Sequence, residues 1–200
     1  MLTLTSGDLI ASGGHRSCYY HPHNPNRCIK ILHSDSAVRD ETREIQYFNV
    51  LRRRKINWQM IARLYGKVET TLGSGVEFDL IRDNDGAVSR PLAWYLEQHD
   101  PALNQAAVVA TEQVVNNLLE QNVIFRDLIA ENILLQKLGE NRFNPVVVDG
   151  VGHNDFIPLC NYSAYLGRKK NLRKWHRDKH NWFGRFNQVN HQIFSFAGLR

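Results

Sequence analysis

The sequence lacks several features that would place it at once in a class of protein. No apolar run approaches the roughly 18 residues that a membrane-spanning helix needs. The N-terminal stretch, Met1–Gly14, has no basic flank and no sustained apolar segment, so it is unlike a secretory signal. The three cysteines are odd in number and include no Cys-x-x-Cys pair, which argues against a disulfide framework and a structural zinc site. We therefore expect a cytoplasmic protein without a membrane span.

The composition is that of an ordinary folded chain, with 42% hydrophobic and 22% charged residues. Its 200 residues suffice for one full core or for two small lobes. The charge is uneven. The segment from Tyr165 onward has nine basic residues and one acidic residue, net +8, whereas the rest has 16 basic and 19 acidic residues, net −3. The two regions are therefore expected to meet different partners.

Apolar and turn patterns predict an N-terminal part made of strands around one helix. The first two strands flank a small-residue turn, Ser12-Gly13-Gly14, and the helix is predicted over Asp35–Lys55. The last two strands would form a hairpin around Gly73-Ser74-Gly75. The predicted strands are Leu9–Ala11, Cys18–Tyr20, Arg27–Leu32, Leu64–Thr70 and Val76–Ile81.

The rest of the chain is predicted to be mainly helical around one hairpin. The polar stretch Asp83–Pro91 is the expected boundary between two domains, residues 1–82 and residues 83–200. A helix is predicted over Pro101–Gln121, because Asp100 can cap it and proline is tolerated at its first position. A hairpin of Ile133–Leu138 and Pro145–Val148 follows, and then a helix around Tyr165–Trp182.

The basic C-terminal segment has more than one interpretation. Nucleic acid is a possible partner through phosphate contacts and stacking, but it is not favoured, since no helix-turn-helix or zinc-finger pattern is present. An anionic membrane surface or a solvated helix face would fit the same charges. Leu172, Trp175 and Trp182 share one helical face, which favours a helix docked on the protein itself. His176 and His180 lie four residues apart without a third ligand, so a metal clamp is not favoured.

A carboxylate and an amide lie five residues apart between the predicted helix and hairpin. They are Asp127 and Asn132 in F-R-D-L-I-A-E-N-I-L-L, and a buried strand then ends in Asp149 and Gly150. This order resembles the protein-kinase catalytic loop, H-R-D-L-x-x-x-N, and the metal-binding D-F-G. The resemblance implies that Asp127 is the catalytic base and that Asn132 and Asp149 hold Mg²⁺ through hard oxygen ligands. Singly, each residue would be better explained by turn chemistry.

Two upstream features fit phosphate binding. Gly13 and Gly14 lie in a segment that aligns with the kinase pattern L-G-x-G-x-F-G-x-V, although only Gly13 falls on a glycine position, and Ala11 and Arg16 replace the other two. The run C-I-K-I resembles the kinase strand V-A-I-K and directs Lys30 at the phosphates. An ordinary hairpin turn and the solvent face of an edge strand are the alternative interpretations.

The predicted partner of Lys30 is a glutamate on the following helix. Glu44 shares a helical face with Phe48 and Leu51, and a buried acid needs a cation. Glu41, on the same face, is the second candidate. Alternatively this face is solvated and Glu44 pairs with a helix neighbour, Arg52 or Lys55.

The complete set follows the kinase order over about Leu9–Gly152. More narrowly, the chain resembles the small bacterial YrbL-like proteins, the "PhoP regulatory network" family. The similarity lies in G-x-H-R-x-C-Y-x-H-P, R-C-I-K-I, R-E-x-x-Y, Y-G-x-V-E-T and E-N-I-L. The resemblance implies an α+β, two-lobe protein-kinase-like fold with a shortened, mostly helical C-terminal lobe that binds ATP and Mg²⁺.

Several departures from the kinase pattern leave the activity open. Phe125 replaces the histidine of the loop, Ile129 and Ala130 replace its Lys-Pro pair, and no A-P-E motif follows. One hypothesis is an ATP- and Mg²⁺-dependent phosphotransferase with an unknown acceptor, either a metabolite or the protein itself. The other is a nucleotide-binding pseudokinase or adaptor that serves a regulatory protein partner without phosphotransfer.

Overall fold

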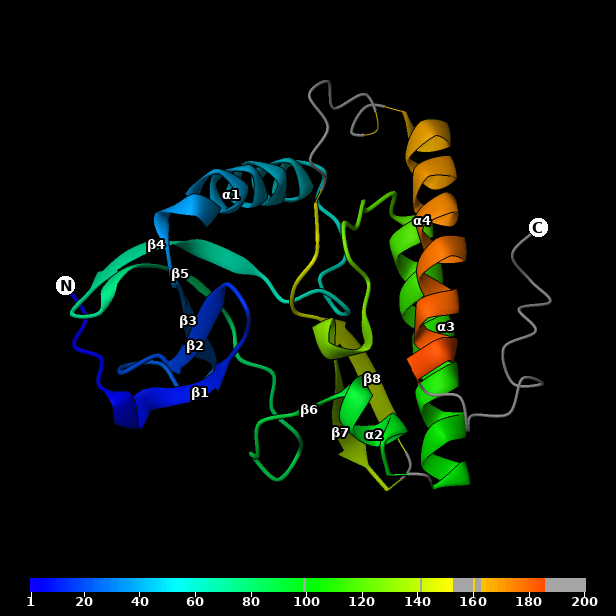
Figure 1. Ribbon diagram of the computed structural model, residues 1–200, viewed down its shortest axis with the longest axis horizontal. Helices are drawn as coiled ribbons and strands as arrows, with labels where there is room; N and C mark the ends of the chain where they lie inside the picture. Colours follow the sequence, from blue (N-terminus) through cyan, green and yellow to red (C-terminus); the bar gives the residue numbers. More distant parts are fainter. Residues whose placement is uncertain (99, 141, 153–159, 161–162, 186–200) are drawn as a thin grey trace.

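The computed structural model describes residues 1–98, 100–140, 142–152, 160 and 163–185, with backbone alone for residues 101 and 178–185. The architecture is α+β, with two antiparallel sheets and helices packed beside them (Figure 1). The N-terminal half contains the larger sheet and one long helix. The C-terminal half contains the smaller sheet and most of the helical residues.

The N-terminal sheet has five strands in the order β1-β2-β3-β5-β4. Strand β3 has strands on both sides, and its four central residues, 28–31, are buried. The β-branched residues Ile29 and Ile31 favour the strand. Because every pairing in this sheet is antiparallel, short turns join β1 to β2 and β4 to β5. The strands are β1 Leu9–Ser12, β2 Arg16–Tyr20, β3 Arg27–Leu32, β4 Leu64–Thr70 and β5 Gly73–Asp79.

The turn between β4 and β5 was predicted at the wrong place. It consists of Thr71 and Leu72, whereas Gly73 and Gly75 belong to β5. Thr70 closes the turn, because its hydroxyl donates to the Gly73 carbonyl oxygen at 2.7 Å and accepts from the Leu72 N–H at 3.1 Å. A Cβ on Gly75 would lie 2.7 Å from Cγ2 of Ile29. The glycines therefore permit a positive φ and close packing inside the strand rather than forming the turn.

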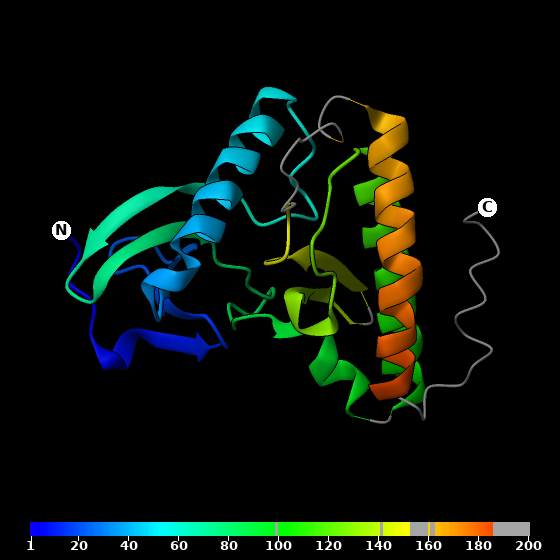
Figure 2. The same ribbon diagram turned by 45° about the horizontal axis from the view of Figure 1, so that its top comes forward.

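One long helix covers the N-terminal sheet. The predicted helix begins as a 3₁₀ turn, Asp35–Ala37, and continues as α1, Val38–Arg53. Figures 1 and 2 show α1 lying along the sheet on the side of β4. Its buried residues recur every three or four positions, as the amphipathic pattern predicted. They are Glu41, Glu44, Tyr47, Phe48 and Leu51.

The C-terminal half combines a three-stranded sheet with helices. Helix α3 begins as predicted, with the Asp100 carboxylate accepting from the N–H groups of Ala102 and Leu103. Helices α3 and α4 lie side by side in both ribbon views (Figures 1 and 2). The short helix α2 was not predicted. The elements are β6 Arg90–Pro91, α2 Leu92–Leu96, α3 Pro101–Glu120, a 3₁₀ turn Ala130–Asn132, β7 Ile133–Gly139, β8 Arg142–Val147 and α4 Ala164–Arg185.

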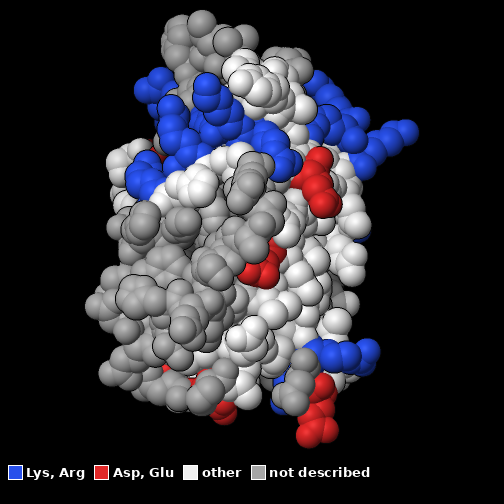
Figure 3. Space-filling model, turned by 90° about the vertical axis from the view of Figure 1, so that its right-hand side faces the viewer, with Lys and Arg blue, Asp and Glu red and all other residues white. Residues whose placement is uncertain are grey.

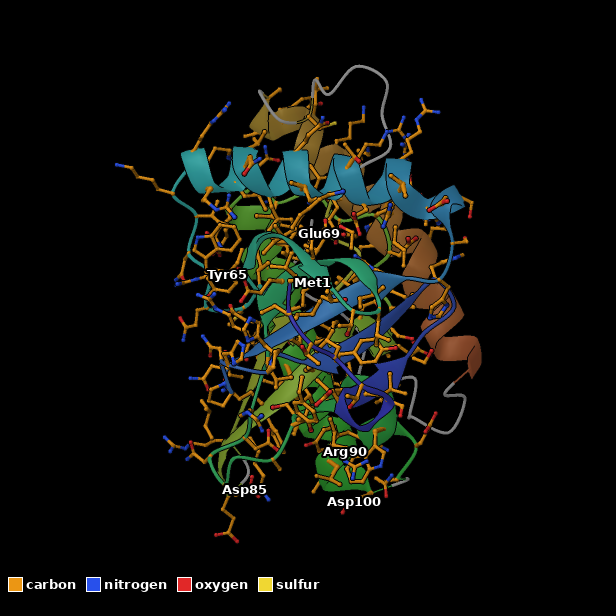
Figure 4. The ribbon with its side chains drawn as sticks, turned by 90° about the vertical axis from the view of Figure 1, so that its left-hand side faces the viewer. Met1, Tyr65, Glu69, Asp85, Arg90 and Asp100 are labelled. Carbon is orange, nitrogen blue, oxygen red and sulfur yellow. The ribbon has the colours of Figure 1, made fainter. Side chains whose placement is uncertain are left out.

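A single buried cluster runs through both halves. It includes Phe48 and Phe78 of the first half and Leu118 and Phe125 of the second. Figure 4 views the molecule from the side of the first sheet, with Tyr65 of β4 near α1 and with Asp85, Arg90 and Asp100 at the opposite end. The division into domains at residue 82 stays a prediction.

Candidate functional site

Lys30 lies between the two sheets, on the face of β3 that looks toward the C-terminal half. It is 9% exposed, and its Nζ donates to the Val148 carbonyl oxygen at 2.5 Å. The same nitrogen lies 3.7 Å from Oδ2 of Asp149. Because β3 is an inner strand of the sheet, the interpretation of Lys30 as a solvent-facing edge residue is wrong.

Arg16 occupies the centre of the site and was not predicted. Its side chain is 13% exposed. One nitrogen donates to Oε2 of Glu44 at 2.6 Å and another to Oδ1 of Asp149 at 2.7 Å. Burial by itself lowers the pKa of Arg16, but the negative charges of Glu44 and Asp149 outweigh burial and raise it. The guanidinium therefore stays charged and bridges α1 to the end of β8.

Asp149 is held as an anion. Burial alone would raise the pKa of Asp149, but the charges of Lys30 and Arg16 outweigh it and lower that pKa to about 2. The Gly150 N–H also donates to Oδ1 of Asp149 at 2.7 Å. At neutral pH this carboxylate is ionised, so its oxygens suit a divalent cation or a cationic side chain.

The loop that contains Asp127 is fixed against the residues after β8. The Arg126 N–H donates to the Gly150 carbonyl oxygen at 2.6 Å, and Nδ2 of Asn132 donates to the Asp127 carbonyl oxygen at 3.1 Å. Gly150 has φ +78°, and a Cβ there would overlap the Asp127 carbonyl oxygen. The Asp127 side chain is 59% exposed and lies 3.6 Å from Nε of Arg126. Hydrogen bonds thus hold the backbone of the loop, while the carboxylate of Asp127 is largely exposed.

Two cavities meet at this cluster of charges. One has a volume of about 590 Å³ and the other about 890 Å³, the size of small-molecule sites. Gly13, Arg16, Asn132 and Asp149 line both. The smaller cavity also touches Gly14, Glu44, Arg126 and Asp127. The larger is lined by Lys30 and by several apolar side chains, among them Ile10, Cys18, Phe78, Leu80 and Leu134.

The structure thus brings the predicted site residues to one place, but pairs two of them differently. Glu44 pairs with Arg16, and Lys30 lies beside Asp149. The ion pairs of the described residues do not include Lys30 with Glu44, so that predicted pairing was wrong. Glu41 pairs instead with Lys67, at 3.0 Å. The alternative partners of Glu44, Arg52 and Lys55, do not contact it in the described part of the chain either.

The sequence did contain a signal for Arg16. It stands where the kinase pattern has a glycine, directly after the small-residue turn. A charged side chain that is largely buried needs an oppositely charged partner, and Arg16 finds two such partners, Glu44 and Asp149, in the cleft. Spacing alone could not rank two cations on neighbouring strands, Arg16 on β2 and Lys30 on β3, as partners of one helical glutamate.

Helix α4 packs against the segment that leads to Asp127. The buried side chain of Asn171 donates to the Val123 carbonyl oxygen at 2.7 Å and accepts from the Phe125 N–H at 3.4 Å. Trp175 is 1% exposed, and Leu172 packs against the same core. The prediction of a docked C-terminal helix is therefore confirmed for these two residues, while the side chain of Trp182 lies outside the described residues.

The opposite face of α4 is basic. Figure 3 shows Lys and Arg side chains gathered over the upper part of this face of the molecule. Over 164–177 the helix has six basic residues and no acidic one, and Arg168, Lys169, Arg173 and Arg177 are exposed. Among the residues described, no group of three metal-ligating side chains occurs, and the side chain of His180 lies outside them. No helix in the described ranges is both long and apolar enough to cross a bilayer.

These observations define an α+β protein with a charged cleft between two antiparallel sheets. Comparison with known proteins gives the family: residues 2–181 match the model of "PhoP regulatory network protein YrbL". The chain is 33% identical over 181 residues to "Uncharacterized protein YrbL" of Escherichia coli (strain K12), covering 88% of this chain and 86% of that protein. The protein of the same name from Shigella flexneri matches equally. The chain belongs to the YrbL family.

Proposed function

We propose that this protein is an ATP- and Mg²⁺-dependent phosphotransferase of the protein-kinase-like superfamily, with two lobes and a shortened C-terminal lobe. One observation supports this above the others. Lys30, Asp127, Asn132 and Asp149 come from separate segments of the chain and converge on two adjoining cavities. This is the set of groups that kinases use for phosphate, proton and metal.

The residues present fit a magnesium nucleotide. Asp149 supplies an anionic oxygen, and Nδ2 of Asn132 donates to the Asp127 carbonyl oxygen, which leaves Oδ1 as the ligand atom of Asn132. Lys30 and Arg16 supply cations for phosphate oxygens, and Gly13 supplies backbone at the turn. The larger cavity, about 890 Å³ with apolar walls, suits a nucleobase.

The chemistry of the site follows from these placements. Bound Mg-ATP supplies the transferable phosphoryl group and a cation that offsets its charge. Asp127, whose exposed carboxylate lines the smaller cavity, accepts the proton of an acceptor hydroxyl that enters there. Lys30 and Arg16 orient the phosphates, and Glu44 positions Arg16 from α1. Arg126 lies 3.6 Å from Asp127 and adds positive charge to the smaller cavity, in which Ile129 replaces the lysine of the kinase loop.

A second function is favoured by the same arginine. Arg16 holds the carboxylates of Glu44 and Asp149 together, so the proposed metal ligand already has a cationic partner. A protein that keeps this bridge would bind nucleotide without turnover. It would act as a pseudokinase or adaptor in the bacterial regulatory network that its family name indicates, through a protein partner.

The first experiment tests nucleotide binding. Mg-ATP at about 100 times its dissociation constant should stabilise the fold by roughly 2.7 kcal/mol. Lys30→Ala and Asp149→Ala should each remove most of the shift in melting temperature. Glu97→Gln, an exposed change away from both cavities, is the control and should keep it. A wild-type protein whose melting temperature does not move with millimolar Mg-ATP would refute both functions.

The second experiment separates the enzyme from the adaptor. Asp127→Ala should leave binding of Mg-ATP nearly intact and abolish phosphotransfer, because the base acts on the acceptor rather than on the nucleotide. The readouts are ADP release and labelling of the protein or of a metabolite panel. Binding without any transfer by the wild-type protein would select the pseudokinase.

A further inference from the structure

Two cysteines, Cys18 of β2 and Cys28 of β3, line the larger cavity. In the β2–β3 pairing, Cys18 is opposite Lys30 and Tyr20 is opposite Cys28. Residues opposite each other, and residues two apart on one strand, share a face of a sheet. Cys18, Cys28 and Lys30 therefore share the face toward the C-terminal half, and all three line the larger cavity.

The two thiols are diagonal neighbours in the β2–β3 ladder and lie on the same face of the sheet. Both are free thiols. Cys28 is 3% exposed, and its Sγ also donates to the Asp79 carbonyl oxygen at 3.6 Å, whereas Cys18 is only half-buried. A reagent in the cavity therefore meets Cys18 first and Cys28 behind it.

The surroundings make the two thiols unequal. The neighbouring Cys28 thiol and the charges of Lys30 and Arg16 lower the pKa of Cys18, although burial opposes them. The Cys18 thiol and burial both raise the pKa of Cys28. A cysteine near cations and open to a cavity has the properties of a reactive thiolate, and a buried neighbour has those of a resolving thiol.

We propose that Cys18 and Cys28 form an oxidisable dithiol site in the wall of the larger cavity, with a peroxide as the oxidant. The Cys18 thiolate attacks one peroxide oxygen, the O–O bond breaks, and Cys18 becomes a sulfenic acid while water leaves after protonation. The Cys28 thiol then displaces the sulfenic hydroxyl as water and forms the disulfide. Two thiols lose two electrons and two protons, and one hydrogen peroxide is reduced to two waters.

The disulfide would couple oxidation to occupancy of the cavity. Diagonal neighbours in a sheet lie about 7–8 Å apart, and a disulfide needs its Cα atoms within about 4.4–6.8 Å, so the bond would shift β2 relative to β3. It would also hold Cys18 and Cys28 away from any ligand that they contact in the reduced state. That ligand is a nucleobase if the proposed function holds.

The test uses the full chain without nucleotide and hydrogen peroxide as the probe. After oxidation, the count of free thiols should fall from three to one, and peptide mapping should find Cys18 linked to Cys28. Cys160 should remain free, and Cys160→Ala should still form the bond. In Cys28→Ala, dimedone should trap a sulfenic acid on Cys18. Peptide maps of the wild-type protein in which Cys160 is the oxidised residue, or in which Cys18 stays reduced, would overturn the proposal.

A parallel arm adds Mg-ATP before the peroxide. Slower formation of the Cys18–Cys28 bond supports a nucleotide beneath the two strands. An unchanged rate contradicts the assignment of the cavity to a nucleotide. The dithiol site itself is tested only by the experiment without nucleotide.

Discussion

Gly150 shows how strongly a single residue is constrained at this site. It follows Asp149 just after β8, has φ +78°, and packs where a Cβ would overlap the Asp127 carbonyl oxygen. Glycine is needed for two independent reasons, the backbone conformation and the close approach of the loop that carries Asp127. Gly86 provides a comparison in which only the first reason applies, since it has φ +85° and open space around it.

We predict that Gly150→Ala is more destabilising than Gly86→Ala. The left-handed conformation alone costs an alanine about 1–2 kcal/mol, and this should be the whole effect at Gly86. At Gly150 the overlap with Asp127 adds to it, so the loop must move. Urea unfolding of both variants measures the difference. Equal losses would mean that the loop yields freely and does not hold Asp127 in place.

The low pKa of Asp149 predicts a dependence of stability on pH. Its ordinary value of 3.8 applies to the unfolded chain, and the folded value is about 2. The stabilisation is therefore fully present above pH 3.8 and is lost as the pH falls through about 2. It amounts to something on the order of 1–2 kcal/mol, allowing for solvent screening.

Asp149→Asn should remove this contribution. The difference in unfolding free energy between wild type and variant should shrink as the pH is lowered from about 5 toward 2, because protonation removes the same charge. Glu97→Gln, on the exposed surface, provides the baseline. A difference that stays constant with pH would show that Asp149 is not held by Arg16 and Lys30 as a charged group.

Among the elements, α4 has two sides of different kinds, one buried and one basic. Its buried side carries Asn171 and Trp175 against the core, and the charged residues over 164–177 are all basic. The segment before Asp127 depends on Asn171, which holds the backbone at Val123 and Phe125. A helix that the sequence marks mainly by its charge is therefore also a support of the candidate catalytic loop.

We predict that Trp175→Ala destabilises the protein by about 3–5 kcal/mol, the usual cost of truncating a fully buried large aromatic residue. Arg173→Ala, two positions earlier on the exposed side, should change stability by less than about 0.5 kcal/mol. Thermal unfolding of both variants checks this. Similar small effects for the two changes would mean that α4 is not docked in solution.

For the whole molecule, the shared core predicts that the two halves unfold together. Tyr47 of α1 connects them, because its hydroxyl accepts from the Ile124 N–H at 2.7 Å in the C-terminal half. Tyr47→Phe leaves that buried N–H without this partner and should cost about 1–3 kcal/mol. Tyr65→Phe removes an exposed hydroxyl from Asp79 and should cost much less.

For the wild type, and for each tyrosine variant at its own stability, circular dichroism and tryptophan fluorescence should give coincident unfolding midpoints. Separate midpoints would show instead that the halves are independent domains, as the predicted division at residue 82 would allow.

Much of this protein is determined by the sequence itself. The cap at Asp100, the buried face of α1 and the strand over Arg27–Leu32 all follow from local patterns, because capping, helical periodicity and strand propensity act over a few residues. The residues of the candidate site could also be chosen from their order along the chain, since a motif fixes which groups recur together.

Only the tertiary structure decided how those groups are paired. Glu44 could in principle meet Lys30, Arg52 or Lys55, yet the fold gives it Arg16, and gives Lys30 to Asp149. The same holds for the two thiols of the larger cavity, which are ten positions apart in sequence and adjacent only across β2 and β3. Pair energies fall off with distance in space, and distances across strands and between halves are set by packing rather than by sequence spacing.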